Sequence, residues 1–237
     1  MARYYLAALG VVLAVSVGAT AFLVYRNNAD PDGATPPIAA GDNVAIPATS
    51  TPSPTPSPSP SPVPPHYVFP VIASNLSYAH EHHDYPATDV IAACGSKNVA
   101  VTDGVILEVN RVDTWNPKVD AGATRGGLSV SLLGDDGVRY YGSHYASILP
   151  EIEAGVRVHA GQQLGVVGHT GDAGACHLHF GISPVCLRTA DWWTRRGVIW
   201  PWPYLDSWRA GGNKSPVAEI ADWSSKHPCL TSAPPGY

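Results

Sequence analysis

The chain has 237 residues, with 14 basic and 19 acidic side chains and a formal net charge of -5 at pH 7. This balance provides no basic surface for a phosphate backbone, so nucleic acid is excluded as a partner. Many of the 23 prolines lie in one stretch of the N-terminal third, which sets that stretch apart from a folded domain.

Residues 4–25 form an uncharged apolar run, close to the ~20 residues that a helix needs to cross a bilayer. We therefore predict that residues 1–26 are a transmembrane anchor or a signal peptide. Arg3, before the apolar run, favours an N-terminus in the cytoplasm, whereas Arg26, after the run, opposes that orientation. Residues 19–21, Ala-Thr-Ala, fit the cleavage site of a secretory signal. The sequence predicts an extracytoplasmic protein, membrane-anchored or secreted.

Residues 27–65 are rich in Pro, Ser and Thr and end in alternating Thr-Pro and Ser-Pro pairs. Such a segment cannot bury enough apolar surface to offset its conformational entropy, and its prolines favour extended polyproline geometry. We predict a disordered linker that holds the following domain away from the membrane.

About 170 residues follow this linker, enough for a single domain with a core of its own. Apolar alternation typical of strands recurs at short intervals, in residues 99–101, 105–109, 128–133, 138–141, 155–158, 164–168 and 177–182. The sequence Gly-Asp-Asp-Gly at 134–137 predicts a hairpin between two of these strands. We expect residues 66–186 to form an all-β domain, an antiparallel sandwich or flattened barrel.

The last of these strands contains His177, Leu178 and His179. Successive side chains of a strand point to opposite faces, so the two histidines share one face and Leu178 faces an apolar layer. Imidazole is the commonest protein ligand for zinc, and it also moves protons near neutral pH.

Three histidines at positions 80, 82 and 83 precede a carboxylate, Asp89. A catalytic zinc usually takes three protein ligands, which one of these histidines, Asp89 and His179 would supply. A hydrolytic site also needs a general base and a group that stabilises the oxyanion, and His144 and His177 suit these roles.

Taken together, these segments resemble the lysostaphin/LytM-type zinc metallopeptidases, which cut peptide bonds in peptidoglycan. The resemblance runs from about residue 82 to residue 184, and it includes the His…Asp element, the Gly-Val-Ile strand after Asp103, a Tyr-x-x-His element, a Val-x-x-Gly-x-x-Leu-Gly segment and His-Leu-His-Phe. It implies an all-β lysostaphin-type fold, a Zn²⁺ cofactor bound by His83, Asp89 and His179, and a reaction centre flanked by His144 and His177.

The first ligand departs from the family spacing, which is His-x-x-x-Asp, because His83 lies six residues before Asp89. We interpret residues 84–88 as a longer loop, since loops at strand ends tolerate insertion. His82 is the alternate ligand, and His80 is interpreted as a surface residue. Asp84 either orients a ligating imidazole or is a solvated turn residue.

The chain contains four cysteines, Cys94, Cys176, Cys186 and Cys229. An even number in an exported domain predicts two disulfides, for which three pairings exist. We interpret the pairs as Cys176 with Cys186 and Cys94 with Cys229. A cysteine zinc site is disfavoured, because the chain has no Cys-x-x-Cys spacing.

Residues 187–237 are rich in tryptophan and lie beyond the family resemblance. We expect this C-terminal extension to pack on the domain, because a cluster of tryptophans is more often buried than used to bind sugars. Residues 191–196 and 203–209 are candidates for short helices or turns.

The sequence thus predicts a zinc metalloendopeptidase that hydrolyses stem peptides or cross-bridges of peptidoglycan. The alternative is a non-catalytic module that binds peptidoglycan or regulates another hydrolase, and a zinc carboxypeptidase is a third reading. A nucleotide partner is excluded, because the glycine-rich residues 165–171 lack the lysine of a phosphate-binding loop. A serine hydrolase is disfavoured by the absence of a Gly-x-Ser-x-Gly motif.

Overall fold

The computed structural model describes residues 64–235 of the chain. The predicted membrane segment, residues 1–26, and the predicted linker up to residue 63 lie outside the described residues. Among the residues that are described, no helix is both long enough and apolar enough to cross a membrane.

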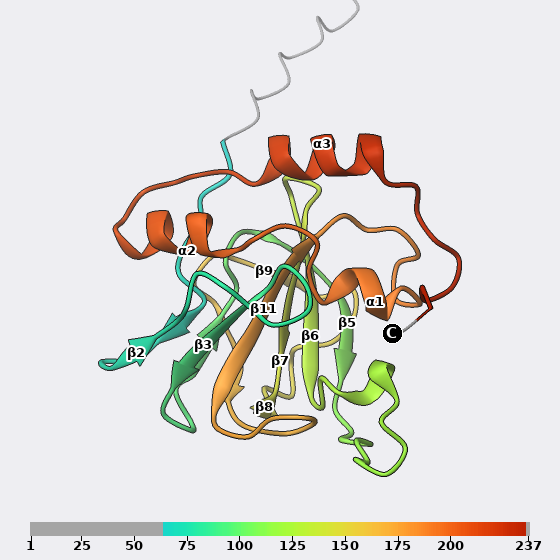
Figure 1. The fold of residues 1–237 in the computed structure, drawn as a ribbon. Helices are drawn as coiled ribbons and strands as arrows, with labels where there is room; N and C mark the ends of the chain where they lie inside the picture. Colours follow the sequence, from blue (N-terminus) through green and yellow to red (C-terminus); the bar gives the residue numbers. More distant parts are fainter. Residues whose placement is uncertain (1–63, 236–237) are drawn as a thin grey trace, which may run out of the picture. The chain divides into compact units, whose positions relative to one another are not determined.

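Two antiparallel sheets make up most of the regular secondary structure of the described residues (Figure 1). The larger sheet contains, in spatial order, β2 (Leu76–Ser77), β3 (Thr88–Ala92), β11 (His177–Ser183), β7 (Arg139–Ser143), β6 (Ser129–Gly134), β5 (Gly104–Asn110) and β9 (Arg157–Val158). The smaller sheet contains β1 (Val71–Ile72), β4 (Lys97–Val99), β10 (Gln163–Val167) and β8 (Tyr145–Ile148). The predicted antiparallel β-fold is confirmed over these residues.

The helices are short, and most of them lie in the C-terminal extension. They are the 3-10 turn η1 (Gly122–Thr124) and the α-helices α1 (Trp192–Arg195), α2 (Trp202–Arg209) and α3 (Val217–Lys226). α1 lies within residues 191–196, which the sequence marks as a helix or turn, and α2 begins one residue before the second such range, 203–209. The sequence analysis did not predict α3, in which only Ile220 is buried.

The core lies on one face of β11. Leu178, Phe180 and Ile182 are buried there in a continuous apolar cluster that includes residues of both sheets, such as Val130 of β6 and Leu164 of β10. Burial of this apolar surface is the main favourable contribution to folding. Strand alternation then turns the intervening histidines of β11 to the opposite face.

The predicted hairpin joins β6 to β7 and brings β7 alongside β11. Gly137 has a φ of +81°, a left-handed conformation that glycine adopts without a steric cost. The Asp136 carboxylate accepts a hydrogen bond from the Val138 amide at 3.0 Å, which closes the turn. The resulting register places Ser143 of β7 opposite His179 of β11.

The two disulfides join Cys94 to Cys176 and Cys186 to Cys229, so the pairing inferred from the sequence is wrong. Cys176 directly precedes β11 and Cys186 follows it, so an extended strand of about 20 Å separates them. A disulfide spans less than about 7 Å between Cα atoms. Cys94 instead follows β3, the antiparallel neighbour of β11, and therefore lies beside Cys176, with Cα atoms 5.3 Å apart.

The C-terminal extension packs on the core through α2. The Trp208 ring stacks on the Tyr67 ring with centroids 5.2 Å apart. It also forms edge-to-face pairs with Tyr140 and Phe180. The Trp208 indole N–H donates to the Lys214 carbonyl oxygen at 2.9 Å, which satisfies its polar atom on burial. Trp208 thus acts as a packing residue.

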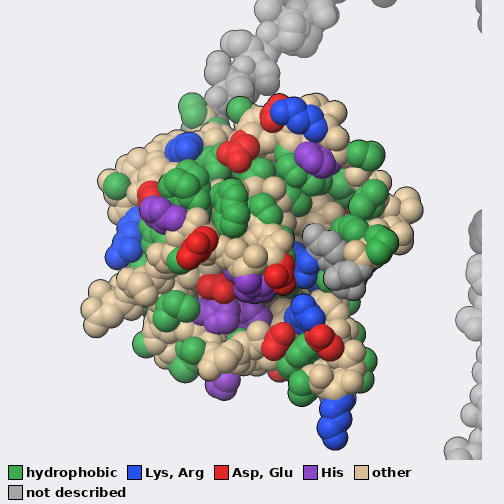
Figure 2. Space-filling model, in the orientation of Figure 1, with side chains coloured by type: hydrophobic (Ala, Val, Ile, Leu, Met, Phe, Trp, Pro, Cys, Tyr) green, Lys and Arg blue, Asp and Glu red, His purple; other side chains and the backbone are tan. Residues whose placement is uncertain are grey.

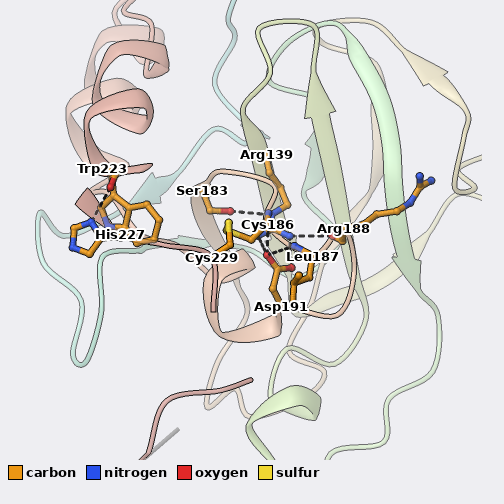
Figure 3. The surroundings of a disulfide bond; sticks show 9 residues. All are labelled: Arg139, Ser183, Cys186, Leu187, Arg188, Asp191, Trp223, His227 and Cys229. Carbon is orange, nitrogen blue, oxygen red and sulfur yellow. Dashed lines mark hydrogen bonds and ion pairs between the residues drawn. A yellow bond between two sulfur atoms is a disulfide. The ribbon is translucent and has the colours of Figure 1, made fainter. Parts of the chain in front are cut away.

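A buried ion pair joins the beginning of the extension to the larger sheet (Figure 3). The side chains of Arg139 on β7 and Asp191 before α1 are completely buried, and two bonds of 2.7 and 2.9 Å connect them. Arg139 also donates to Ser183 Oγ on β11 and to the Arg188 carbonyl oxygen. The neighbouring Cys186 disulfide fastens the same region to the C-terminal tail.

Replacing Asp191 with Asn should strongly destabilise the fold, because it leaves the Arg139 charge buried without a counter-ion. Breaking such a pair costs roughly 3–5 kcal/mol of unfolding free energy, measured by urea denaturation with the disulfides intact. Lys226→Ala is the control, since its pair with Asp222 is exposed and contributes less than about 1 kcal/mol. Equal losses in the two variants would contradict this account.

Candidate metal centre

Three side chains converge at one end of the β3 and β11 pair. Ligand atoms of His82, Asp89 and His179 all lie within 4.8 Å of one another. Asp89 Oδ1 is 3.0 Å from His179 Nδ1, and Asp89 Oδ2 is 3.7 Å from His82 Nε2. Two imidazoles and one carboxylate are a donor set that zinc accepts, so the residues present fit this metal.

The register of the sheet explains how two of these residues meet. Asp89 on β3 and His179 on β11 are directly opposed in the antiparallel pairing. Directly opposed residues point to the same face, so both side chains leave the sheet on the face opposite the core. His82 reaches them from the loop before β3.

The structure places His82, and not His83, in this group. The His82 side chain is only 3% exposed and its ring lies 4.7 Å from the Tyr85 ring. The His83 side chain is 66% exposed and contacts the Asp84 carboxylate at 3.0 Å. The structure thus brings the alternate, His82, to Asp89 and His179, whereas the side chain of His83, the sequence-based choice, is mostly exposed.

His144 and His177 lie beside the three residues, as the sequence analysis expects. Their ring centroids are 4.6 Å apart, and His177 Nε2 lies 3.7 Å from Asp89 Oδ1. His144 follows β7 directly and has a φ of +65°, a conformation uncommon for a residue with a side chain. Backbone strain of this kind is often found at functional sites.

Each of the four histidines of the site has one ring nitrogen within hydrogen-bonding distance of a backbone carbonyl oxygen. The pairs are His82 Nδ1 with Tyr85 (3.1 Å), His144 Nδ1 with Thr170 (2.7 Å), His177 Nδ1 with Ala175 (2.9 Å) and His179 Nε2 with Arg196 (2.9 Å). A carbonyl oxygen can only accept, so the bonded nitrogen carries the proton. In the neutral rings of His82, His144 and His177 the other nitrogen is then free to bind a metal or accept a proton. His179 Nδ1 instead lies 3.0 Å from the Asp89 carboxylate and would bind a metal once it carries no proton.

The surroundings also set the charges of the site. Burial, and to a smaller extent the nearby His179, lower the pKa of His144 to about 4. Burial likewise lowers the pKa of His82 to about 4. Burial alone would raise the pKa of Asp89, but the hydrogen bond and charge of His179 hold it well below its usual range. Near neutral pH His82 and His144 are therefore neutral and Asp89 is ionised. A neutral imidazole and a carboxylate are the forms in which His82 and Asp89 can bind a metal.

These residues line a cavity of about 260 Å³ that opens on one side of the sheet. Figure 2 shows the histidine side chains gathered near the middle of this face, with acidic and basic side chains beside them. The remaining lining comes from the η1 region, from β7, from the loops before β3 and β11 and from the C-terminal extension. It includes His83, Tyr85, Gly122, Arg125, Tyr141, Ser143, Asp172, Gly174, Trp192, Arg195 and Arg196.

Except for His83, the sequence analysis missed these additional lining residues. Tyr141 and Ser143 could have been found, because alternation along β7 puts them on one face and register puts Ser143 opposite His179. Trp192, Arg195 and Arg196 carry no local signal, since their approach to the cavity depends on how the extension packs.

Residues 83–189 match the model of peptidase family M23. This part of the chain is therefore similar to peptidase family M23. The matched residues include Asp89, His144, His177 and His179, whereas His82 lies just before them. The resemblance to lysostaphin/LytM-type peptidases stated from the sequence is thereby confirmed.

Solved structures of peptidases are similar to parts of the chain. The catalytic domain of lysostaphin from Staphylococcus simulans is 25% identical, with a TM-score of 0.43 over 56% of this chain and 93% of that chain. Lysostaphin itself is 25% identical, with a TM-score of 0.44 over 60% and 55%. A zinc-containing peptidase from Vibrio cholerae is 18% identical, with a TM-score of 0.39 over 49% and 36%. No curated protein matches the chain.

The stability of the metal-free protein should fall as pH decreases from about 6.5 to about 4. Folding lowers the His144 pKa from its ordinary 6.5 to about 4, so in this window the unfolded chain binds the proton more readily than the folded one. The contribution of neutral His144 to the free energy of unfolding is fully present above pH 6.5. It is lost progressively as the pH falls toward 4. Between pH 7 and pH 5, His144→Gln should lose roughly 1–2 kcal/mol less unfolding free energy than the wild type, measured by urea denaturation with chelator.

The control is His159→Gln, which makes the same exchange at a side chain that is 72% exposed. This variant should keep the pH dependence of the wild type. The assignment to His144 fails if its variant keeps that dependence too.

Proposed function

We propose that this protein is a zinc-dependent endopeptidase that hydrolyses peptide bonds in the stem peptides or cross-bridges of peptidoglycan. The observation that carries the proposal is the convergence of His82, Asp89 and His179, with His144 and His177 beside them, in the part of the chain that is similar to peptidase family M23. The peptidoglycan substrate is inferred from the resemblance to lysostaphin/LytM-type peptidases.

His82, through Nε2, Asp89, through its carboxylate, and His179, through Nδ1, would hold the zinc. Their other ring nitrogens donate to carbonyl oxygens, which orients both imidazoles and makes them better ligands. Zinc bound there polarises the scissile carbonyl and makes water a better nucleophile near neutral pH.

His144 and His177 would carry the protons of the reaction. Each has its Nδ1 held by a backbone carbonyl oxygen, so each neutral ring has a lone pair on Nε2. One Nε2 accepts the proton of the attacking water and then, as Nε2–H, donates it to the leaving amine. The other would take a proton from solvent at Nε2 and stabilise the developing oxyanion by donating this N–H. The two roles stay interchangeable, because both histidines present the same nitrogen.

We further propose an extracytoplasmic location, with the N-terminal segment as a membrane anchor or a cleaved signal. Two properties support this location. Residues 4–25 are apolar and uncharged, and the four cysteines form two disulfides, which persist in oxidising compartments.

Alanine variants of the two adjacent histidines test the proposed ligand set. His82→Ala should lose its tightly bound zinc and reduce cleavage of cross-linked muropeptides by at least about 100-fold, because a first ligand is removed. His83→Ala is the matched control and should keep both zinc and activity. Zinc is measured by elemental analysis after dialysis, and cleavage by chromatography with end-group analysis.

The result also separates the alternative functions. New internal amino termini indicate an endopeptidase, whereas release of single terminal residues indicates a carboxypeptidase. Binding of muropeptides without cleavage by the zinc-loaded wild type would contradict the proposal and favour a non-catalytic module. Unchanged cleavage by His179→Ala or in the presence of chelator would also contradict it.

A further inference from the structure

Residues 196–199 of the C-terminal extension lie against β11 where β3 no longer covers it. β3 pairs with β11 only from residue 177 to residue 180. Beyond that point, the Val198 amide donates to the Ile182 carbonyl oxygen at 3.0 Å, and Ile199 forms a bridge with Ile182. The extension therefore takes the place of β3 beside the end of β11.

The fit of this segment is close on both sides. A Cβ atom on Gly181 of β11 would lie 2.2 Å from the Arg196 carbonyl oxygen. A Cβ atom on Gly197 would lie 2.2 Å from the Pro86 carbonyl oxygen, and Gly197 has a φ of +135° that side chains disfavour. Glycine is thus required at both positions, and the backbone at Arg196 is confined between β11 and the loop that leads from His82 to β3.

This confinement fixes an acceptor for His179. The Arg196 carbonyl oxygen lies 2.9 Å from His179 Nε2, which leaves Nδ1 directed to Asp89 at 3.0 Å. If the carbonyl moved away, the ring would lose the bond that selects its tautomer and orientation.

The same segment contacts the residue that holds the other histidine. The Arg196 guanidinium lies 3.9 Å above the Tyr85 ring, a cation–π contact. The Tyr85 carbonyl oxygen is in turn 3.1 Å from His82 Nδ1. Arg196 therefore supports His179 directly through its backbone and His82 through Tyr85.

Contacts of the extension on both sides of residues 196–199 also hold this segment and the loop that carries His82 in place. Arg196 follows α1, whose start is held by the buried pair of Arg139 with Asp191 (Figure 3). On the other side, α2 contacts the segment before His82: the His80 ring stacks on Trp202 at 4.2 Å, and His80 Nε2 is 3.2 Å from Asp206.

We propose that residues 196–199 are a positioning segment that orients His179 and His82 for metal binding. The segment lies outside the residues that match the peptidase family, which end at 189. The inference rests on the proposed function in one respect, that the metal is zinc. Arg196 and Gly197 are positioning residues, since they act through His179 and Tyr85.

Gly181→Ala and Gly197→Ala test the proposal, because each adds a Cβ that must displace the segment. Zinc affinity of the full chain, measured by competition with a chromophoric chelator, should weaken about 10- to 100-fold in both variants. Gly211→Ala is the matched control: this glycine also lies in the extension with a positive φ of +78°, but its Cβ would meet no atom within 4 Å. It should bind zinc as tightly as the wild type.

A second measurement does not depend on the variants folding. Nitrogen-15 NMR of the zinc-loaded wild type should show His179 coordinated through Nδ1, with a proton on Nε2. Coordination through Nε2 would overturn the positioning role. So would wild-type zinc affinity in both Gly181→Ala and Gly197→Ala. A wild type that binds no zinc at all would instead overturn the proposed function, so the two failures are distinguishable.

Discussion

The antiparallel register between β3 and β11 is the constraint on which the site depends. It opposes Asp89 to His179 and directs both side chains away from the core. A shift of one residue would turn every side chain of the moving strand to the other face, so the site and the core would be lost together. The disulfide of Cys94 with Cys176 joins this strand pair at one end, and residues 196–199 cover β11 toward the other.

Backbone carbonyl groups give the site its chemical character. They orient four imidazoles of the site, and burial keeps His82 and His144 neutral while Asp89 stays ionised. A metal site needs these protonation states, and a general base needs a free lone pair. The fold therefore orients the site through backbone carbonyl groups, which any residue could supply. The side chains of the histidines and Asp89 provide the atoms that would bind the metal or move protons.

Alternation along the chain predicted the strands, the antiparallel class and the shared face of His177 and His179, because these are local properties with a period of two. The choice between His82 and His83 could not be made locally, since it depends on how a bend places neighbouring side chains. The predicted disulfide pairing was wrong because the pairing depends on which strands lie side by side. The role of Arg196 was invisible, because a backbone carbonyl carries no sequence signal.

The most direct test of the central claim is anomalous X-ray diffraction at the zinc edge from crystals grown with zinc. The account predicts one strong peak about 2.0–2.2 Å from His82 Nε2, an Asp89 carboxylate oxygen and His179 Nδ1. A peak coordinated by His83, or a zinc-soaked crystal with no peak near Asp89 and His179, would contradict it.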